Sequence, residues 1–262
     1  MTRRRSAPVT LTLLAVLGVA LVVLPLIGLI VRTPWSRAGE ILGSETARTA
    51  LRLSLIVATA SALLGSLVAF PLAWALARSD FRGKALVRAL VVLPLVMPPV
   101  VGGVALLSAF GRRGLVGGPV YDVFGVQITF TVWAAVLAST FVSFPLLVLA
   151  LEVGLRSLDR RLEDAASTMG ASRWYVLRRV TLPLLGPQIA AGLVLAWARA
   201  LGEFGATITF AGNLPGRTQT LPLAVFEELQ TDPGGAIALS LLLVTVSLIV
   251  IVTLRGRFLQ TS

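Results

Sequence analysis

Long stretches without a charged residue recur along the chain and dominate its pattern. Five of them lack Asp, Glu, Lys and Arg entirely: residues 6–31, 53–77, 89–111, 123–151 and 233–254. A sixth, residues 180–198, is followed by Arg199 and Glu203 and then continues apolar to about Ala211. About 20 apolar residues in helical form cross a bilayer core, and a helix satisfies its own backbone hydrogen bonds in lipid. The pattern predicts an all-α polytopic membrane protein with six transmembrane helices, at about residues 9–31, 51–77, 87–110, 128–151, 188–211 and 234–254.

The first apolar stretch follows a basic start, Arg3-Arg4-Arg5, as a secretory signal peptide does. A signal peptide has an apolar region of about 7–15 residues and a small-x-small cleavage site. This stretch is longer and has no convincing site of that kind, so we expect it to be retained as the first span. Because no loop exceeds about 35 residues, we expect one membrane domain over residues 1–262 and no soluble domain.

Composition and charge agree with a membrane protein. The chain is 56% hydrophobic and 13% charged, with a mean hydropathy of +0.90, whereas a soluble domain is about a quarter charged. Its 23 Lys and Arg exceed its 12 Asp and Glu and give a net charge of +11. With the N-terminus in the cytoplasm, fifteen basic residues fall in inner segments and seven in outer ones. This asymmetry predicts that both termini are cytoplasmic and explains the basic excess without nucleic acid.

The residue types that are missing exclude several chemistries. The sequence has no Cys and no His, which excludes disulfides, thiolate chemistry and imidazole-based metal sites or catalysis. Its single lysine, Lys84, is followed by Ala85 rather than by Ser or Thr, so no Walker-type phosphate loop is present. We therefore expect no catalytic residue and no metal site in this chain, and no ATP hydrolysis by that route.

The longest inner segment, residues 152–186, contains a short amphipathic helix. Leu162, Ala165, Ala166 and Met169 are spaced to lie on one helical face. The acidic residues Asp159, Glu163 and Asp164 lie toward its start, where the helix dipole favours negative charge. Gly170 is placed to end the helix, Ser172 to cap a second one, and Pro183 and Pro187 to break the chain before span five. Two interpretations follow: a connector lying on the bilayer surface, or a helix that fits a groove of a partner protein, which the small alanines favour.

This segment resembles the EAA loop of ABC importer permeases. The family pattern is Glu-Ala-Ala, three residues, Gly, nine residues, Ile, one residue, Leu-Pro; here Asp164-Ala165-Ala166, Gly170, Val180 and Leu182-Pro183 match it, with Asp for Glu and Val for Ile. The resemblance implies that the loop is the coupling helix, which sits in a cleft of a separate ATP-binding subunit. It also implies that ATP and Mg²⁺ are bound by that subunit. The residues implied to contact it are Glu163, Asp164, Ala165, Ala166, Met169, Gly170 and Ala171.

Two features inside the predicted spans suggest functional roles. A charge inside a span costs about 2.5–3.5 kcal/mol on insertion scales and usually faces a bundle interior or a wet cavity. Arg199 and Glu203 are four residues apart and can pair, either as an ion pair that locks helix packing, which we favour, or as part of an anion path. Pro94, Pro98 and Pro99 weaken the third span; we expect a kink there, and a gate is the further possibility.

Further strings resemble the molybdate branch of these permeases. They are Leu93 to Gly102, Ala198 to Thr207 and Ala211 to Leu223, the last containing Pro-Gly-Arg-Thr-Gln-Thr. Sulfate and thiosulfate permeases share the Gly-Glu-Phe-Gly part, whereas the Pro-Gly-Arg-Thr-Gln-Thr run resembles the molybdate branch. The resemblance implies a homodimeric permease in the cytoplasmic membrane of a prokaryote, working by alternating access with two ATP-binding subunits and an extracytoplasmic oxyanion-binding protein, on molybdate or tungstate. The alternatives are a sulfate or thiosulfate permease, an ion-coupled carrier and a non-transporting scaffold.

Two outer loops carry weaker signals. Residues 111–118, Gly-Arg-Arg-Gly-Leu-Val-Gly-Gly, are rich in glycine but follow no strand, so we expect a flexible loop rather than a phosphate site. Asn213 and Pro215-Gly216 are typical of turns in the loop 212–220. Its Arg217 is either solvated, which we favour, or available to a docking protein.

Overall fold

The computed structural model describes the backbone of residues 8–258 and the side chains of residues 8–253, and every regular element in that part of the chain is helical. Four helices are long and apolar enough to cross a membrane: α1 (Val9–Arg32), α3 (Glu45–Arg78), α7 (Val132–Ser157) and α14 (Pro233–Phe258). Two bent helix pairs are also apolar enough, which gives six crossings if each pair counts as one. The all-helical membrane fold is therefore confirmed, while the number of six spans stays a prediction.

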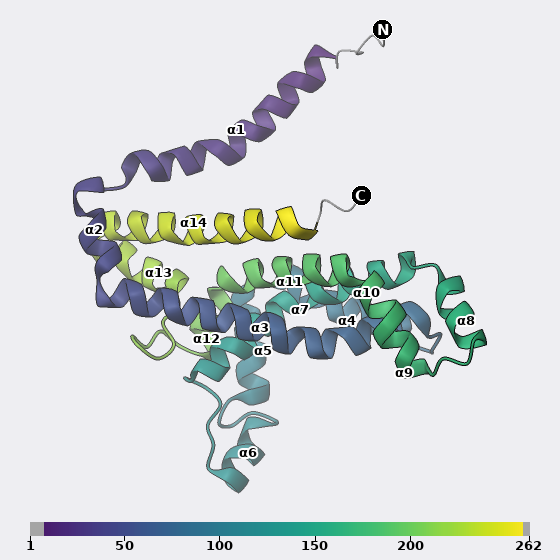
Figure 1. Cartoon of the computed structure of the whole chain (residues 1–262). Coiled ribbons are helices and arrows are strands. Elements are labelled where there is room, and N and C mark those ends of the chain that lie inside the picture. The colour runs from purple at the N-terminus through teal and green to yellow at the C-terminus, as the bar shows by residue number, and fades with distance from the viewer. Residues whose placement is uncertain (1–7, 259–262) are drawn as a thin grey trace.

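Helices α3 and α7 pack along each other at the centre of the bundle (Figure 1). The buried faces of the two helices are rich in alanine, with Ala58, Ala69 and Ala73 on one helix and Ala134 and Ala138 on the other. Small residues let helix backbones approach closely, which is how helices associate in lipid without a hydrophobic driving force. Helix α11 (Gly186–Leu201) packs against both of them and completes the core.

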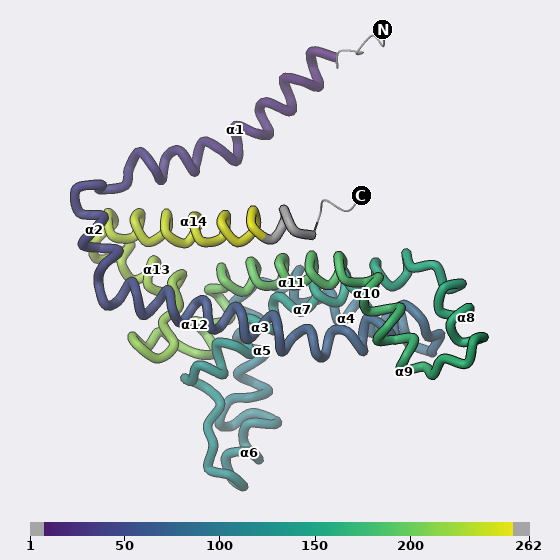
Figure 2. The backbone as a smooth tube through the Cα atoms, in the orientation of Figure 1, coloured from purple at the N-terminus to yellow at the C-terminus, as the bar shows by residue number. Residues whose placement is uncertain are grey.

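The remaining elements lie at the two ends and on one side of the bundle, as the backbone trace in Figure 2 shows. Helices α8 (Arg160–Thr168) and α9 (Arg173–Val176) form one end, which we call the α8 end. Helices α2 (Trp35–Gly43) and α13 (Leu221–Thr231) lie at the opposite end. The short helix α6 (Gly117–Phe124) projects sideways beyond α5 (Pro99–Phe110), and α1 diverges from the bundle toward its N-terminus.

Asp232 joins α13 to α14 at the end opposite α8. Its carboxylate accepts a hydrogen bond from the Gly234 N–H at 3.1 Å and pairs with Arg37 of α2 at 2.9 Å. The backbone N–H of Gly235 and the Arg37 guanidinium lower the pKa of the Asp232 carboxyl below its ordinary value. Asp232 thus caps the start of α14 and links it to α2.

The glycine-rich segment 111–118 forms a loop of consecutive turns that leads into α6 and makes backbone hydrogen bonds within the chain, while its flexibility stays a prediction. The Leu115 and Val116 N–H groups donate to the Ser108 and Ala109 carbonyls at 3.1 and 2.8 Å and so close the end of α5. Gly117 leaves no room for a side chain, since a Cβ there would lie 2.2 Å from the Gly111 carbonyl oxygen. The glycines permit this close turn, from which α6 begins.

Candidate functional site

Helix α8 forms in the segment where the sequence predicts it, and both of its ends are capped. At its start, the Asp159 carboxylate accepts from the Arg161 N–H at 3.0 Å. At its end, Gly170 has a φ of +88°, and the N–H groups of Gly170 and Ala171 donate to the Ser167 and Ala166 carbonyls at 3.0 and 3.1 Å. A left-handed glycine with these two bonds is the usual way for a helix to end in a sharp turn. The helix and its glycine stop are confirmed.

The outer surface of α8 and α9 is uncovered and carries large apolar side chains among its charged and polar ones. Of the four residues predicted to share a face, only Ala166 is buried; Leu162, Ala165 and Met169 are exposed, and Met169 retains 84% of its surface. Trp174 and Tyr175 of α9 are also exposed. We call these five exposed residues, Leu162, Ala165, Met169, Trp174 and Tyr175, the coupling surface. Beside it, Asp164, Ser167, Arg173 and Trp174 help to line an open groove that reaches Trp74 of α3.

Glu163 holds α8 to the bundle. Its Oε1 accepts from Arg78 Nη2 at 3.2 Å and from Thr181 Oγ1 at 2.9 Å. Arg78 is the last residue of α3, and Thr181 ends the π-helix Leu177–Thr181 that follows α9. The side chain of Glu163 is therefore engaged within the chain, whereas Asp164 and Ala165 point outward. Contact of these residues and of Gly170 and Ala171 with an ATP-binding subunit stays a prediction.

The helical segment that starts after Ser172 is interrupted before span five at Leu185, which lies between Pro183 and Pro187, so the predicted break is confirmed. The Ser172 hydroxyl accepts from the Tyr175 N–H at 3.3 Å, which confirms it as a cap. Pro183 lies in α10 (Leu182–Leu184) and Pro187 in the first turn of α11. Proline is tolerated in a first turn because the N–H it lacks would have no partner there. The segment 173–184 and α11 are bent by 66° relative to each other at this break.

The proline-rich segment divides the predicted third span into two helices. Helix α4 (Lys84–Val96) contains Pro94 and stops at Met97, and α5 begins after Pro98 with Pro99 at its first position. The two helices are bent by 119°, so residues 87–110 are not the single helix expected, although the expected kink is confirmed. Met97 and Pro98 have extended ψ angles of 134° and 132°, because a residue before proline is excluded from the helical region.

The predicted fifth span, residues 188–211, is also broken. Helix α11 ends at Leu201, and α12 (Gly205–Phe210) begins after Gly202, Glu203 and Phe204. Glu203 is buried in this break: its Oε2 pairs with Arg199 Nη1 at 2.6 Å, and its Oε1 accepts from the Ala206 N–H at 2.9 Å. The pair thus forms at the predicted spacing, but Glu203 lies beyond the end of α11 and caps α12. Its role in an anion path or as a helix lock stays a prediction.

The two breaks lie against each other, with Pro98 and Pro99 exposed on one of them and Glu203 buried in the other. A Cβ on Gly205 would lie 2.6 Å from Pro99 Cβ, so the start of α12 contacts the start of α5 directly. A Cβ on Gly103 would lie 2.5 Å from Thr209 Cβ, one turn further along both helices. The structure therefore places Pro99 of the possible gate next to the segment that carries Glu203.

Replacing Gly103 by alanine is expected to destabilise the packing of α5 on α12. The new methyl group meets Thr209 Cβ and the Ala206 carbonyl oxygen within 3.0 Å, and overpacking of this kind costs about 1–3 kcal/mol. Gly102→Ala is the matched control, because its Cβ meets only side-chain atoms at 3.3 Å or more, at the edge of Phe141 and the end of Met97. Thermal unfolding in detergent should show a lower midpoint for Gly103→Ala than for Gly102→Ala; equal midpoints would contradict the close packing of α5 on α12.

Two polar clusters were not predicted from the sequence. Glu152, near the end of α7, is buried and pairs with Arg88 and Arg156. The second cluster joins the loop 212–220 to α13: the Glu227 carboxylate of α13 accepts from the side-chain amides of Asn213 and Gln219 at 3.0 and 2.5 Å. Arg217 of the same loop is exposed. The spacing of four between Glu152 and Arg156 is visible in the sequence, but Arg88 lies 64 residues from Glu152.

Among the described residues, no group of three or more acidic side chains is arranged to hold a metal ion.

Comparison with known proteins identifies the class of this chain. Residues 62–260 match the family described as "Binding-protein-dependent transport system inner membrane component". The chain belongs to this family of membrane-embedded transport subunits.

Individual relatives and a solved structure narrow this further. The chain is 47% identical over 243 residues, 93% of its own length and 92% of the relative, to the Molybdenum transport system permease protein ModB of Mycobacterium tuberculosis. It is 33% identical over 229 residues, 87% and 86% of the two chains, to a probable sulfate transport system permease protein cysT of Chlorella vulgaris. A crystal structure of a bacterial alginate ABC transporter, in complex with an alginate pentasaccharide-bound periplasmic protein, matches with a TM-score of 0.73 at 17% identity over 94% and 92% of the chains. At that identity the structural match shows the fold alone.

Proposed function

We propose that this chain is the permease subunit of an ATP-driven ABC importer and that it forms the path by which molybdate crosses the cytoplasmic membrane. The observation that carries the proposal is the 47% identity, over nearly the whole chain, to a molybdenum transport permease. The lower identity to a probable sulfate permease makes sulfate or thiosulfate the weaker alternative. Tungstate has the charge and nearly the shape of molybdate and belongs to the same proposal.

The coupling surface supports an ATP-binding partner. Exposed Met, Trp and Tyr side chains at the end of two short capped helices are the residue types that anchor protein interfaces. The small, exposed Ala165 within it lets a partner backbone approach closely. ATP and Mg²⁺ would be bound by this partner, since the chain has no phosphate loop of its own.

We further propose the complete assembly that the family implies. It comprises two copies of this chain, two ATP-binding subunits at the α8 end, and an oxyanion-binding protein at the opposite end, where the loop 212–220 lies. The α8 end and both termini would then face the cytoplasm, in agreement with the positive-inside distribution of arginines. ATP binding would move the two α8 helices together and open the path toward the loaded binding protein.

Reconstitution tests the proposal. The chain is placed in proteoliposomes with an ATP-binding subunit and an oxyanion-binding protein from the same organism, and uptake of radiolabelled molybdate is measured. We expect uptake that requires both partners and ATP on the α8 side, and that excess tungstate reduces more than excess sulfate does. Uptake without the ATP-binding subunit would favour an ion-coupled carrier and overturn the proposal; preferential sulfate uptake would replace molybdate as the substrate.

A further inference from the structure

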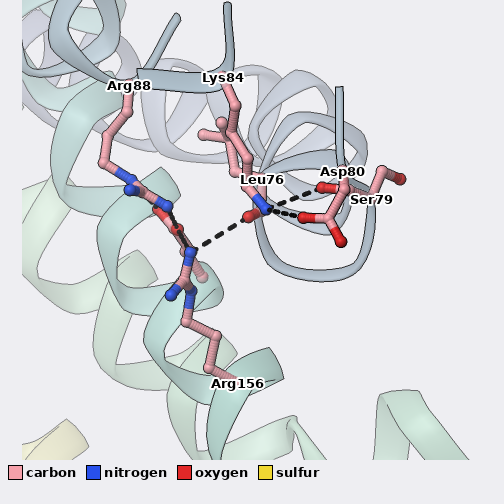
Figure 3. Close-up of polar contacts among 7 residues, drawn as sticks. Leu76, Ser79, Asp80, Lys84, Arg88 and Arg156 are labelled. Carbon is pink, nitrogen blue, oxygen red and sulfur yellow. Dashed lines mark hydrogen bonds and ion pairs between the residues drawn. The ribbon is translucent and has the colours of Figure 1, made fainter. Parts of the chain in front are cut away.

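The Glu152 carboxylate is the centre of a charged cluster near the α8 end. Its side chain is only 5% exposed, and it pairs with two arginines: Arg156 one turn further along α7, at 2.8 Å, and Arg88 of α4, whose Nη2 contacts Oε1 and whose Nε lies 3.4 Å from Oε2. Figure 3 shows Arg88 and Arg156 converging from the two helices. A buried carboxylate is retained only when such charged donors compensate its loss of hydration.

The cluster connects α8 with α4 through two further helices. Arg156 Nη2 also donates to the Leu76 carbonyl, near the end of α3, at 3.3 Å (Figure 3). Two residues later, Arg78 pairs with Glu163 of α8 at 3.2 Å. Charged hydrogen bonds therefore join α8 to the end of α3, the last turn of α3 to α7, and α7 to α4 through Glu152, with the α3 backbone between Leu76 and Arg78 connecting the first two links.

Helix α4 leads directly to the paired breaks in the bundle. Its charged residues, Lys84 and Arg88, both lie in its first two turns, and the rest of the helix is apolar up to Pro98. After the 119° bend, Pro99 contacts Gly205 beside the Glu203 cap of α12. Helix α4 therefore connects Arg88 to the segment in which both broken helices meet, and a displacement of Arg88 would move that segment.

We propose that Glu152 is a positioning residue that couples α8 to α4, so that motion driven by ATP at α8 reaches the breaks at Pro98 and Glu203. The inference rests on the proposed function. A buried ion pair contributes little net stability but holds its partners in one orientation, which suits a mechanical link better than a source of stability. Arg88 and Arg156 are 38% and 49% exposed, so both can turn to water when Glu152 is neutralised, and the bundle is expected to remain folded.

The first test measures coupling in the reconstituted complex with its ATP-binding and oxyanion-binding subunits. Glu152→Gln keeps the size of the side chain but loses its charge. We expect ATP hydrolysis to persist while molybdate uptake falls, so that the ATP consumed per molybdate imported rises several-fold. Asp80→Asn is the matched control: it removes the Lys84–Asp80 pair (3.3 Å), which holds the same end of α4 but is exposed, and should leave the ratio unchanged. A purely structural role for Glu152 would instead lower the yield of complex and reduce both rates in parallel.

The second test replaces the ion pair by a covalent link. Because the chain contains no cysteine, Arg88→Cys/Glu152→Cys introduces its only two thiols, which a short bifunctional thiol reagent can join. Cross-linking should restore a low ratio of ATP to molybdate in the double variant and not in either single variant. If the wild-type complex imports molybdate while Glu152→Gln has the same ratio, or if the cross-linked variant stays uncoupled, the role of Glu152 is overturned. Failure of the wild-type complex to import molybdate would instead overturn the proposed function.

Discussion

Gly170→Trp is expected to abolish ATP-driven molybdate uptake while the chain is still produced and inserted in the membrane. Gly170 has a φ of +88°, a region that costs an L-residue roughly 1–2 kcal/mol. No atom lies within 4 Å of its Cβ position, so a side chain starts out into open space. The indole would project beside Met169 at the edge of the coupling surface and keep an ATP-binding subunit from seating. Uptake assays combined with quantification of inserted protein measure the effect.

Gly125→Trp is the matched control for this variant. Gly125 also follows a short helix, α6, in the left-handed region at φ +64°, and also has no atom within 4 Å of its Cβ position. It therefore suffers the same backbone strain and presents the same exposed ring away from the coupling surface. We expect Gly125→Trp to transport. Normal transport with intact ATP coupling in Gly170→Trp would show that α8 is not where the ATP-binding subunit acts.

Glu203→Ala is expected to give the largest loss of stability. The substitution removes the partner of Arg199 and the acceptor for the Ala206 N–H in one step. Breaking a buried ion pair by removing one member costs about 3–5 kcal/mol. Since the Arg199 side chain is 31% exposed and can recover some hydration, we expect roughly 2–3 kcal/mol here. A lower thermal midpoint of the purified protein in detergent measures the loss.

Two further variants separate the roles of the pair. Glu203→Gln keeps an oxygen that accepts from the Ala206 N–H and is expected to lose less stability than Glu203→Ala. Arg199→Met/Glu203→Gln removes both charges together. If the pair is a helix lock, as we favour, this double variant should fold and retain most of its molybdate uptake. A double variant that folds normally but no longer transports would assign Arg199 and Glu203 to the anion path instead.

The capped helix α8 could be predicted in detail because its signals are local. Asp159, the apolar spacing, Gly170 and Ser172 all act within one or two helical turns, and each has the position in the structure that the sequence predicts. The four long apolar spans were predicted for a similar reason, because a run of uncharged residues long enough to cross the bilayer by itself indicates a transmembrane helix. The errors came where an apolar run was read as one helix: residues 87–110, for which only a kink was expected, and residues 188–211 are each two helices.

The sequence by itself determined that the chain is a helical membrane protein with a polar, glycine-terminated helix between two spans, because hydropathy, helix caps and turn residues act between near neighbours. Only the tertiary structure decided that Glu163 points inward to Arg78, that the breaks at Pro98 and Glu203 meet through Pro99 and Gly205, and that Glu152 joins α4 to α7. These contacts join residues between 64 and 106 positions apart. Such pairings depend on how helices pack, and no pattern within a single helix specifies them.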